Sequence, residues 1–148
     1  MTKIKVSKDK QIEMQKKYAE YQTIDQRVKQ IKEQLEKFEI QIQELNNIHE
    51  SLMELKQVKN NTELLVPMSS GIFVKAAVQN TDKLIVNVGA NIGVEKTIDE
   101  TANLLAVQQN EIVEYRQQLM EQMQLLVNHA GMLERELTAL AESSETGE

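Results

Sequence analysis

A run of five residues in the middle of the chain invites comparison with a phosphate-binding loop. The run GANIG, Gly89 to Gly93, has spaced glycines, but the Gly-Lys-Ser/Thr that completes a phosphate loop does not follow it. The flanking residues alternate as they do in the strands of a hairpin. We therefore interpret these glycines as turn and bulge residues and expect no bound cofactor.

The two histidines do not form a recognisable catalytic or metal-binding set. His49 falls at a core position of a long helical repeat, where a polar residue can fix the register of a coiled coil. His129 lies beside a second such repeat, with no His, Asp or Cys at ligand spacing, and we expect it on the surface. The chain has no cysteine, which excludes disulfides and thiolate metal sites. No metal is expected.

The remaining candidates for chemistry are the carboxylates and the methionines. The carboxylates lie on the outer faces of predicted helices, where no cleft could tune a pair of them for acid–base work. Most of the seven methionines are expected to pack in the core. The sequence therefore does not predict an enzyme.

The composition is that of long helices. Aromatic residues make up 3% of the chain, tryptophan is absent, and Gln, Glu, Lys and Leu dominate. A net charge of −6 gives no electrostatic reason to bind nucleic acid. The start MTKIKVSKDK lacks the apolar run of a signal peptide, and no segment has the roughly 18 apolar residues that span a membrane. We expect a cytoplasmic protein with no membrane partner.

A first coiled-coil helix is predicted over residues 8–60, where neither Pro nor Gly occurs. Its core positions, spaced alternately by three and four, indicate a left-handed coiled coil. Lys17 occupies a core position near the start, so we expect that end to be less tightly paired. The core positions are Tyr21, Ile24, Val28, Ile31, Leu35, Phe38, Ile42, Leu45, His49 and Leu52.

A second coiled-coil helix is predicted over residues 97–142, followed by a disordered polar tail over 143–148. Thr97 and Glu100 have the spacing of a capping box at its start. Its core positions are Ile98, Ala102, Leu105, Gln109, Ile112, Arg116, Leu119, Met123, Leu126, Ala130, Leu133, Leu137 and Leu140. The simplest partner of each helix is the other, in an antiparallel pair that places His49 near Gln109.

The segment between the helices, residues 63–96, alternates apolar and polar residues with the period of strands. Turn residues divide it into strands over about 64–68, 71–78, 83–88 and 91–96, most simply two β-hairpins in series. Pro67, which lacks an N–H, suits an edge strand. Four short strands bury too little to be stable alone, so we expect partner chains to cover them. The predicted oligomerisation residues are Leu65, Val66, Ile72, Val74, Leu84, Val86, Val88 and Val94.

This order of elements, with the runs LLVPMSSGIFVKAAV and DKLIVNVGANIGVEKTIDE, resembles the α-type subunit of prefoldin. The specific motif lies between Leu64 and Glu100, and the second hairpin is the mark of the α class. The resemblance implies a mainly α fold, a long antiparallel coiled-coil hairpin with two β-hairpins between its helices, in one domain. It also implies an α2β4 heterohexamer with β-type subunits. Such a complex holds unfolded client proteins without ATP and hands them to a group II chaperonin.

The open end of the coiled coil is the expected client-binding site. If that end is loosely paired, its apolar side chains are partly exposed and could bind non-native chains from several subunits at once. The alternative for the three leucines is that they complete the core. Two other functions stay open, a filament-forming homologue and a structural coiled-coil spacer. The expected tip residues are Ile4, Val6, Ile12, Met14, Tyr18, Leu133, Leu137 and Leu140.

Overall fold

The chain folds as two long helices with two β-hairpins between them, as the sequence predicts. The computed structural model describes the backbone of residues 2–146 and the side chains of residues 8–146. The elements are α1 (Thr2–Leu55), β1 (Glu63–Ser69), β2 (Ile72–Ala77), β3 (Leu84–Asn87), β4 (Gly93–Lys96) and α2 (Ile98–Glu145). They form two compact units. Unit 1 comprises residues 1–39 and 114–148, and unit 2 comprises residues 40–113.

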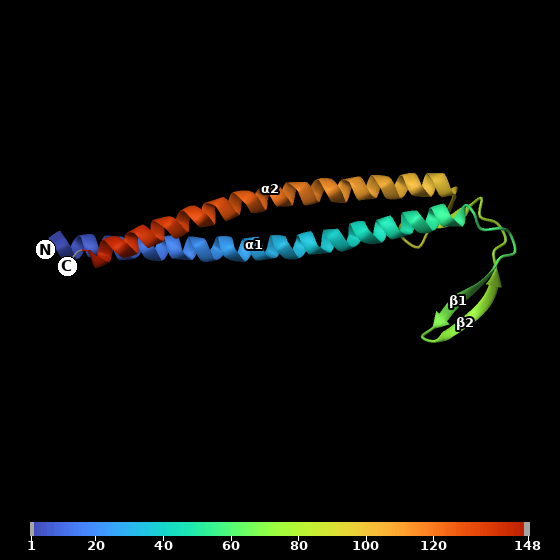
Figure 1. Ribbon diagram of the computed structural model, residues 1–148, viewed down its shortest axis with the longest axis horizontal. Coiled ribbons are helices and arrows are strands. Elements are labelled where there is room, and N and C mark those ends of the chain that lie inside the picture. Colours follow the sequence, from blue (N-terminus) through green and yellow to red (C-terminus); the bar gives the residue numbers. More distant parts are fainter. Residues whose placement is uncertain (1, 147–148) are drawn as a thin grey trace. The chain divides into compact units, whose positions relative to one another are not determined.

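In unit 1, α1 and α2 run antiparallel and pack along an apolar stripe (Figure 1). Ile31 is the most deeply buried large side chain there, at 1% exposed. Ile24, Val28 and Leu133 form a buried cluster, against which Tyr21, Met123, Leu126 and Ala130 pack. All of these residues, Ile31 included, are predicted core positions, so the predicted repeat is the actual contact surface.

Unit 2 has its own apolar cluster, built where α2 begins. Leu52 of α1 and Ile98 and Ala102 of α2 are buried, and Leu84 of β3 packs against them. The predicted capping box is confirmed. The Thr97 amide donates to Glu100 Oε2 at 3.3 Å, and the Glu100 amide donates to Thr97 Oγ1 at 3.1 Å, which satisfies two amides of the first turn.

The pairing of the helices in unit 2 differs from the prediction by about one helical turn. Gln109 Nε2 donates to Asn46 Oδ1 at 2.8 Å, and His49 is exposed. The prediction that His49 forms a polar layer of the core is therefore wrong. An imidazole in the core would lose water without gaining a partner, whereas two side-chain amides satisfy each other.

The helix ends also differ from the predicted ones. α1 ends at Leu55 and not at residue 60, because the amides of Gln57 and Val58 bond to carbonyls three residues back. Asn61 then takes a left-handed conformation with φ of 67°, which turns the chain into β1. α2 continues to Glu145, beyond the predicted end at residue 142, and residues 147–148 lie outside the described part.

The four strands form two separate two-stranded antiparallel sheets, β1 with β2 and β3 with β4. Pro67 pairs with Phe73, and the register shifts between Pro67 and Ser69. In a two-stranded sheet every strand has a free edge, which accommodates a residue without an N–H. The prediction of two hairpins in series is confirmed.

No helix in the described part of the chain is long and apolar enough to cross a bilayer.

We predict that Thr97→Ala lowers the free energy of unfolding by about 1 kcal/mol, because it removes the side chain that caps α2. Urea unfolding followed by circular dichroism at fixed protein concentration measures the change. Thr138→Ala is the control, because the Thr138 hydroxyl bonds to a carbonyl of its own helix, that of Glu134. Equal stability of the two variants would contradict the role assigned to the cap.

Candidate functional site

The hairpin β1–β2 carries apolar side chains on both of its faces. Val66 pairs with Val74 and Leu64 with Ala76, so these four share one face. The other face has Leu65, Pro67 and Phe73 beside an ion pair in which Lys75 Nζ lies 3.8 Å from Glu63 Oε1. Leu65 is 60% exposed and Phe73 56%. None of the residues that the structure describes covers either face of this hairpin.

The hairpin β3–β4 is covered on one face only. Leu84 and Val86 share that face with Val94, and Leu84 contacts the apolar cluster of unit 2. Ile85, on the opposite face, is 79% exposed. This second hairpin therefore has one anchored face and one free face.

The turn between β3 and β4 explains the GANIG run. Asn87 Oδ1 accepts a hydrogen bond from the Gly89 amide at 2.9 Å, and the amide of Val88 donates to the Ile92 carbonyl at 3.1 Å. Ala90 and Asn91 both have positive φ, as does Gly89. These residues form a tight hairpin turn, as the sequence indicates.

Of the eight predicted oligomerisation residues, six are exposed, namely Leu65, Val66, Ile72, Val74, Val88 and Val94. The other two, Leu84 and Val86, are half-buried. Sequence reasoning missed further exposed apolar residues on the same hairpins because it assigned one apolar face to each strand. These are Leu64, Met68, Phe73, Ile85 and Ile92. Apolar faces beside free strand edges are suited to burial against further strands.

The expected tip residues are not exposed alike. Ile12 and Tyr18 are 50% and 56% exposed, and Met14 is half-buried. Leu133 is 4% exposed, so the expectation that it is accessible is wrong: it completes the core with Ile24 and Val28. Leu137 and Leu140 are half-buried, and the side chains of Ile4 and Val6 lie outside the described residues.

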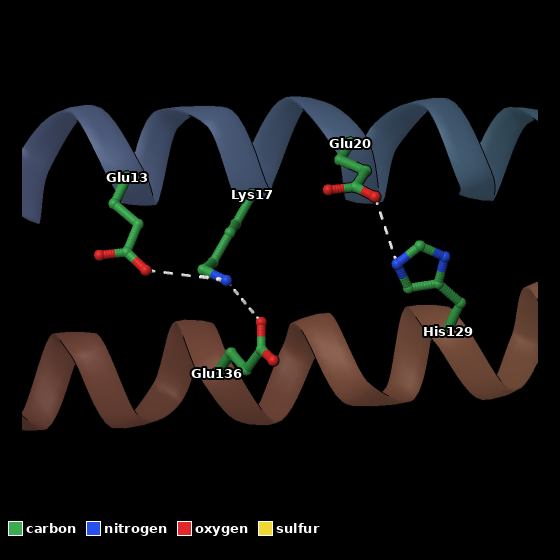
Figure 2. A network of polar contacts seen from close by, with 5 residues as sticks. All are labelled: Glu13, Lys17, Glu20, His129 and Glu136. Atoms are coloured by element: carbon green, nitrogen blue, oxygen red, sulfur yellow. Dashed lines mark hydrogen bonds and ion pairs between the residues drawn. The ribbon is translucent and has the colours of Figure 1, made fainter.

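A network of polar contacts joins α1 and α2 in unit 1, next to the expected tip residue Tyr18 (Figure 2). Lys17 Nζ donates to Glu136 Oε2 at 2.6 Å and lies 3.8 Å from Glu13 Oε1. His129 Nε2 lies 3.2 Å from Glu20 Oε1. The hydrogen bond that Lys17 donates to Glu136 raises the pKa of Lys17. The negative charges of Glu136, Glu13 and Glu20 also raise it, and partial burial lowers it. The lysine at a core position is thus held by an ion pair across the two helices.

The geometry offers surfaces for binding. Among the residues that the structure describes, no three His, Asp or Glu side chains are placed to hold a metal ion. His129, which the sequence places on the surface, is indeed exposed. What the chain presents is apolar surface on its hairpins and apolar side chains along its helices.

The fold is an antiparallel coiled coil with two β-hairpins between its helices, and it has exposed apolar side chains on those hairpins. Residues 24–143 match the family model described as Prefoldin subunit. This chain belongs to the prefoldin family. The resemblance to α-type subunits is confirmed by similar archaeal proteins.

Two related proteins show over how much of the chain the similarity extends. The protein named Prefoldin subunit alpha of Methanopyrus kandleri is 38% identical over 78 residues, 53% of this chain and 50% of that protein. The one of Methanococcus vannielii is 28% identical over 138 residues, 90% of this chain and 92% of that protein. The chain thus spans about half of the first relative and nearly all of the second.

A solved structure, described as filamentous PFD from Methanocaldococcus jannaschii, has the same fold. It aligns with a TM-score of 0.70 at 22% sequence identity, over 78% of this chain and 96% of that one. At this identity the likeness concerns the fold.

We predict that the ion pair of Lys17 stabilises the protein up to alkaline pH. Because the pKa of Lys17 is raised in the folded state, the contribution is fully present below the unfolded value of about 10.4. It is lost as the pH rises through the folded-state value. The difference in unfolding free energy between the natural chain and Lys17→Met, measured in urea, should therefore be constant up to about pH 10 and shift in favour of the variant as the pH rises above that value.

Effects of pH that are common to both proteins cancel in this difference. Lys29→Met is the matched control, since Lys29 pairs with Asp25 on its own helix only, with both side chains about half-exposed or more. A pH-independent difference for Lys17→Met would contradict the assigned role.

Proposed function

We propose that this chain is a subunit of an ATP-independent chaperone that holds unfolded polypeptides. In this proposal two copies assemble with four β-type subunits in the cytoplasm, and the complex hands its clients to a group II chaperonin. The observation that carries the proposal is the exposure of apolar side chains on both faces of β1–β2, beside free strand edges.

The proposed assembly rests on the low stability and the uncovered apolar faces of the hairpins. An isolated two-stranded hairpin is marginally stable in water. Among the described residues, the apolar cluster of unit 2 includes Leu84 of β3–β4 and no residue of β1–β2. Strands from neighbouring subunits would satisfy the free edges and cover Leu65, Ile72 and Phe73. Family membership supports such partners, and β-type subunits are the ones that the proposal names.

Client binding is assigned to the open end of the coiled coil. Of the expected tip residues whose side chains the structure describes, Ile12 and Tyr18 are the exposed ones. One such tip presents too little apolar surface for tight binding. Several tips in one complex raise the affinity through effective concentration, so weak contacts suffice.

A second candidate keeps the fold and changes the assembly. Free strand edges that join head to tail without closing produce filaments, and a filamentous protein has the same fold. Sedimentation of the chain expressed alone separates long polymers from an incomplete complex. A third candidate, a coiled-coil spacer without clients, would not delay aggregation of a denatured protein.

We predict that Val88→Asp releases subunits from the assembly. Val88 is 52% exposed in the single chain, and a carboxylate buried there at an interface would lack a partner. Light scattering after size exclusion, with a β-type subunit present, measures the mass. Ile40→Asp, which places the same charge at a similarly exposed site on α1, should assemble normally. An unchanged mass for Val88→Asp would contradict the assembly role.

We predict that the double variant Ile12→Ser, Tyr18→Ser weakens client protection while the assembled mass stays unchanged. Both side chains are half-exposed, so their loss removes binding surface more than core. Light scattering of a denatured client, titrated with the complex, measures protection. The matched control is Tyr115→Ser, Leu125→Ser, which removes one aromatic and one aliphatic side chain at 60% and 70% exposed. Protection reduced equally in both would refute the tip assignment.

A further inference from the structure

In the helical part of unit 2 the charged side chains are all acidic, and the one other titratable side chain is a histidine. Residues 40–55 of α1 and 98–113 of α2 contain six carboxylates and no Lys or Arg. The carboxylates are Glu44, Glu50, Glu54, Asp99, Glu100 and Glu111. Of these, Asp99 pairs with Lys56 at 2.5 Å. Within the described part of the chain, Glu44 and Glu111 belong to no ion pair, and both are exposed, so their charges face the solvent.

These two glutamates line an open groove between α1 and α2 in unit 2. The groove has a volume of about 340 Å³. Its apolar lining comes from Leu45, Ile48 and Ile112, of which Ile48 is 45% exposed. An aliphatic surface flanked by carboxylates on both helices attracts an aliphatic side chain that has cationic neighbours.

We propose that this groove binds short segments of unfolded polypeptide in which an aliphatic side chain is flanked by Lys or Arg. Along α1 the groove extends from Gln41 to Ile48, about 10 Å at the rise of an α-helix, which is enough for one or two side chains. The aliphatic group contacts Ile48 and Ile112, and the cations lie beside Glu44 and Glu111. The proposal rests on the proposed function in one respect, that the occupant is an unfolded client.

Charge decides between this occupant and a second copy of the same region. The helices of unit 2 from another subunit would bring six further carboxylates and no Lys or Arg to the groove. Like charges at close range oppose such a contact. A basic segment gains attraction from both rims of the groove, and this selects it over an acidic segment with the same aliphatic residues.

The experiment measures direct binding of labelled peptides to the assembled complex by fluorescence anisotropy. The probe is an unstructured peptide with two leucines between pairs of lysines. One comparison peptide has glutamates in place of the lysines, and another has serines in place of the leucines. We expect the first peptide to bind best and its binding to weaken as salt shortens the range of the charge attraction.

The test variant is Glu44→Lys, Glu111→Lys, for which we expect about tenfold weaker binding of the lysine–leucine peptide. The matched control is Glu33→Lys, Glu114→Lys, which makes the same change of charge at exposed sites of unit 1. Equal weakening in the two variants would show an effect of net charge and overturn the proposal. Preference for the acidic peptide, or no dependence on the leucines, would overturn it as well.

Client protection is measured separately with a denatured acidic client, which the groove would not favour. Full protection together with equal peptide binding by all variants would refute the groove and leave the chaperone function standing. Loss of protection with the Ile12→Ser, Tyr18→Ser complex, while that complex still binds the basic peptide, would support two separate sites.

Discussion

The apolar stripe along which α1 packs against α2 is the contact that holds each unit together. A stripe of one side chain in every three or four buries much less surface per residue than a globular core. Ile31, at 1% exposed, and Leu133, at 4%, are the most deeply buried of the described core side chains, and most core positions are only half-buried. Such a core can hold two helices side by side, and it cannot also cover a sheet.

That limit explains why the hairpins are left with apolar faces in solvent. Leu84 packs against the cluster around Leu52 and Ile98 at the helix ends. Among the described residues, none of β1 or β2 belongs to an apolar cluster with the helices, so these strands need surface from elsewhere. An apolar stripe alone would allow several alignments of α1 against α2, and polar pairs between the helices select one of them. These pairs are Lys17 with Glu136, Glu39 with Arg116, and Asn46 with Gln109.

Periodicity alone predicts most of the fold. The repeat of three and four locates both helices and nearly all of their contacts, and the two-residue alternation locates the four strands to within two residues. The capping box is equally readable, because Thr97 and Glu100 are neighbours in sequence.

What the sequence does not reveal depends on contacts between distant residues. The exposure of His49 follows from Asn46 reaching Gln109, and the burial of Leu133 follows from its position against Ile24 and Val28. A heptad repeat marks all core positions alike, and it does not tell which of them are buried in the folded chain. The acidic groove was missed for the same reason, since Glu44 and Glu111 become neighbours only after the helices pair.

The capped start of α2 has a consequence for the order in which the chain folds. The ion pair of Lys56 with Asp99 closes a loop of 43 residues, whereas the contact of Lys10 with Ser143 closes one of 133. Loop-closure entropy favours forming the shorter loop first, and each later contact then extends a pairing of the helices that has already begun. During synthesis α1 is complete before the first residue of α2 leaves the ribosome. The newly made helix therefore exists for a time with its own apolar stripe uncovered.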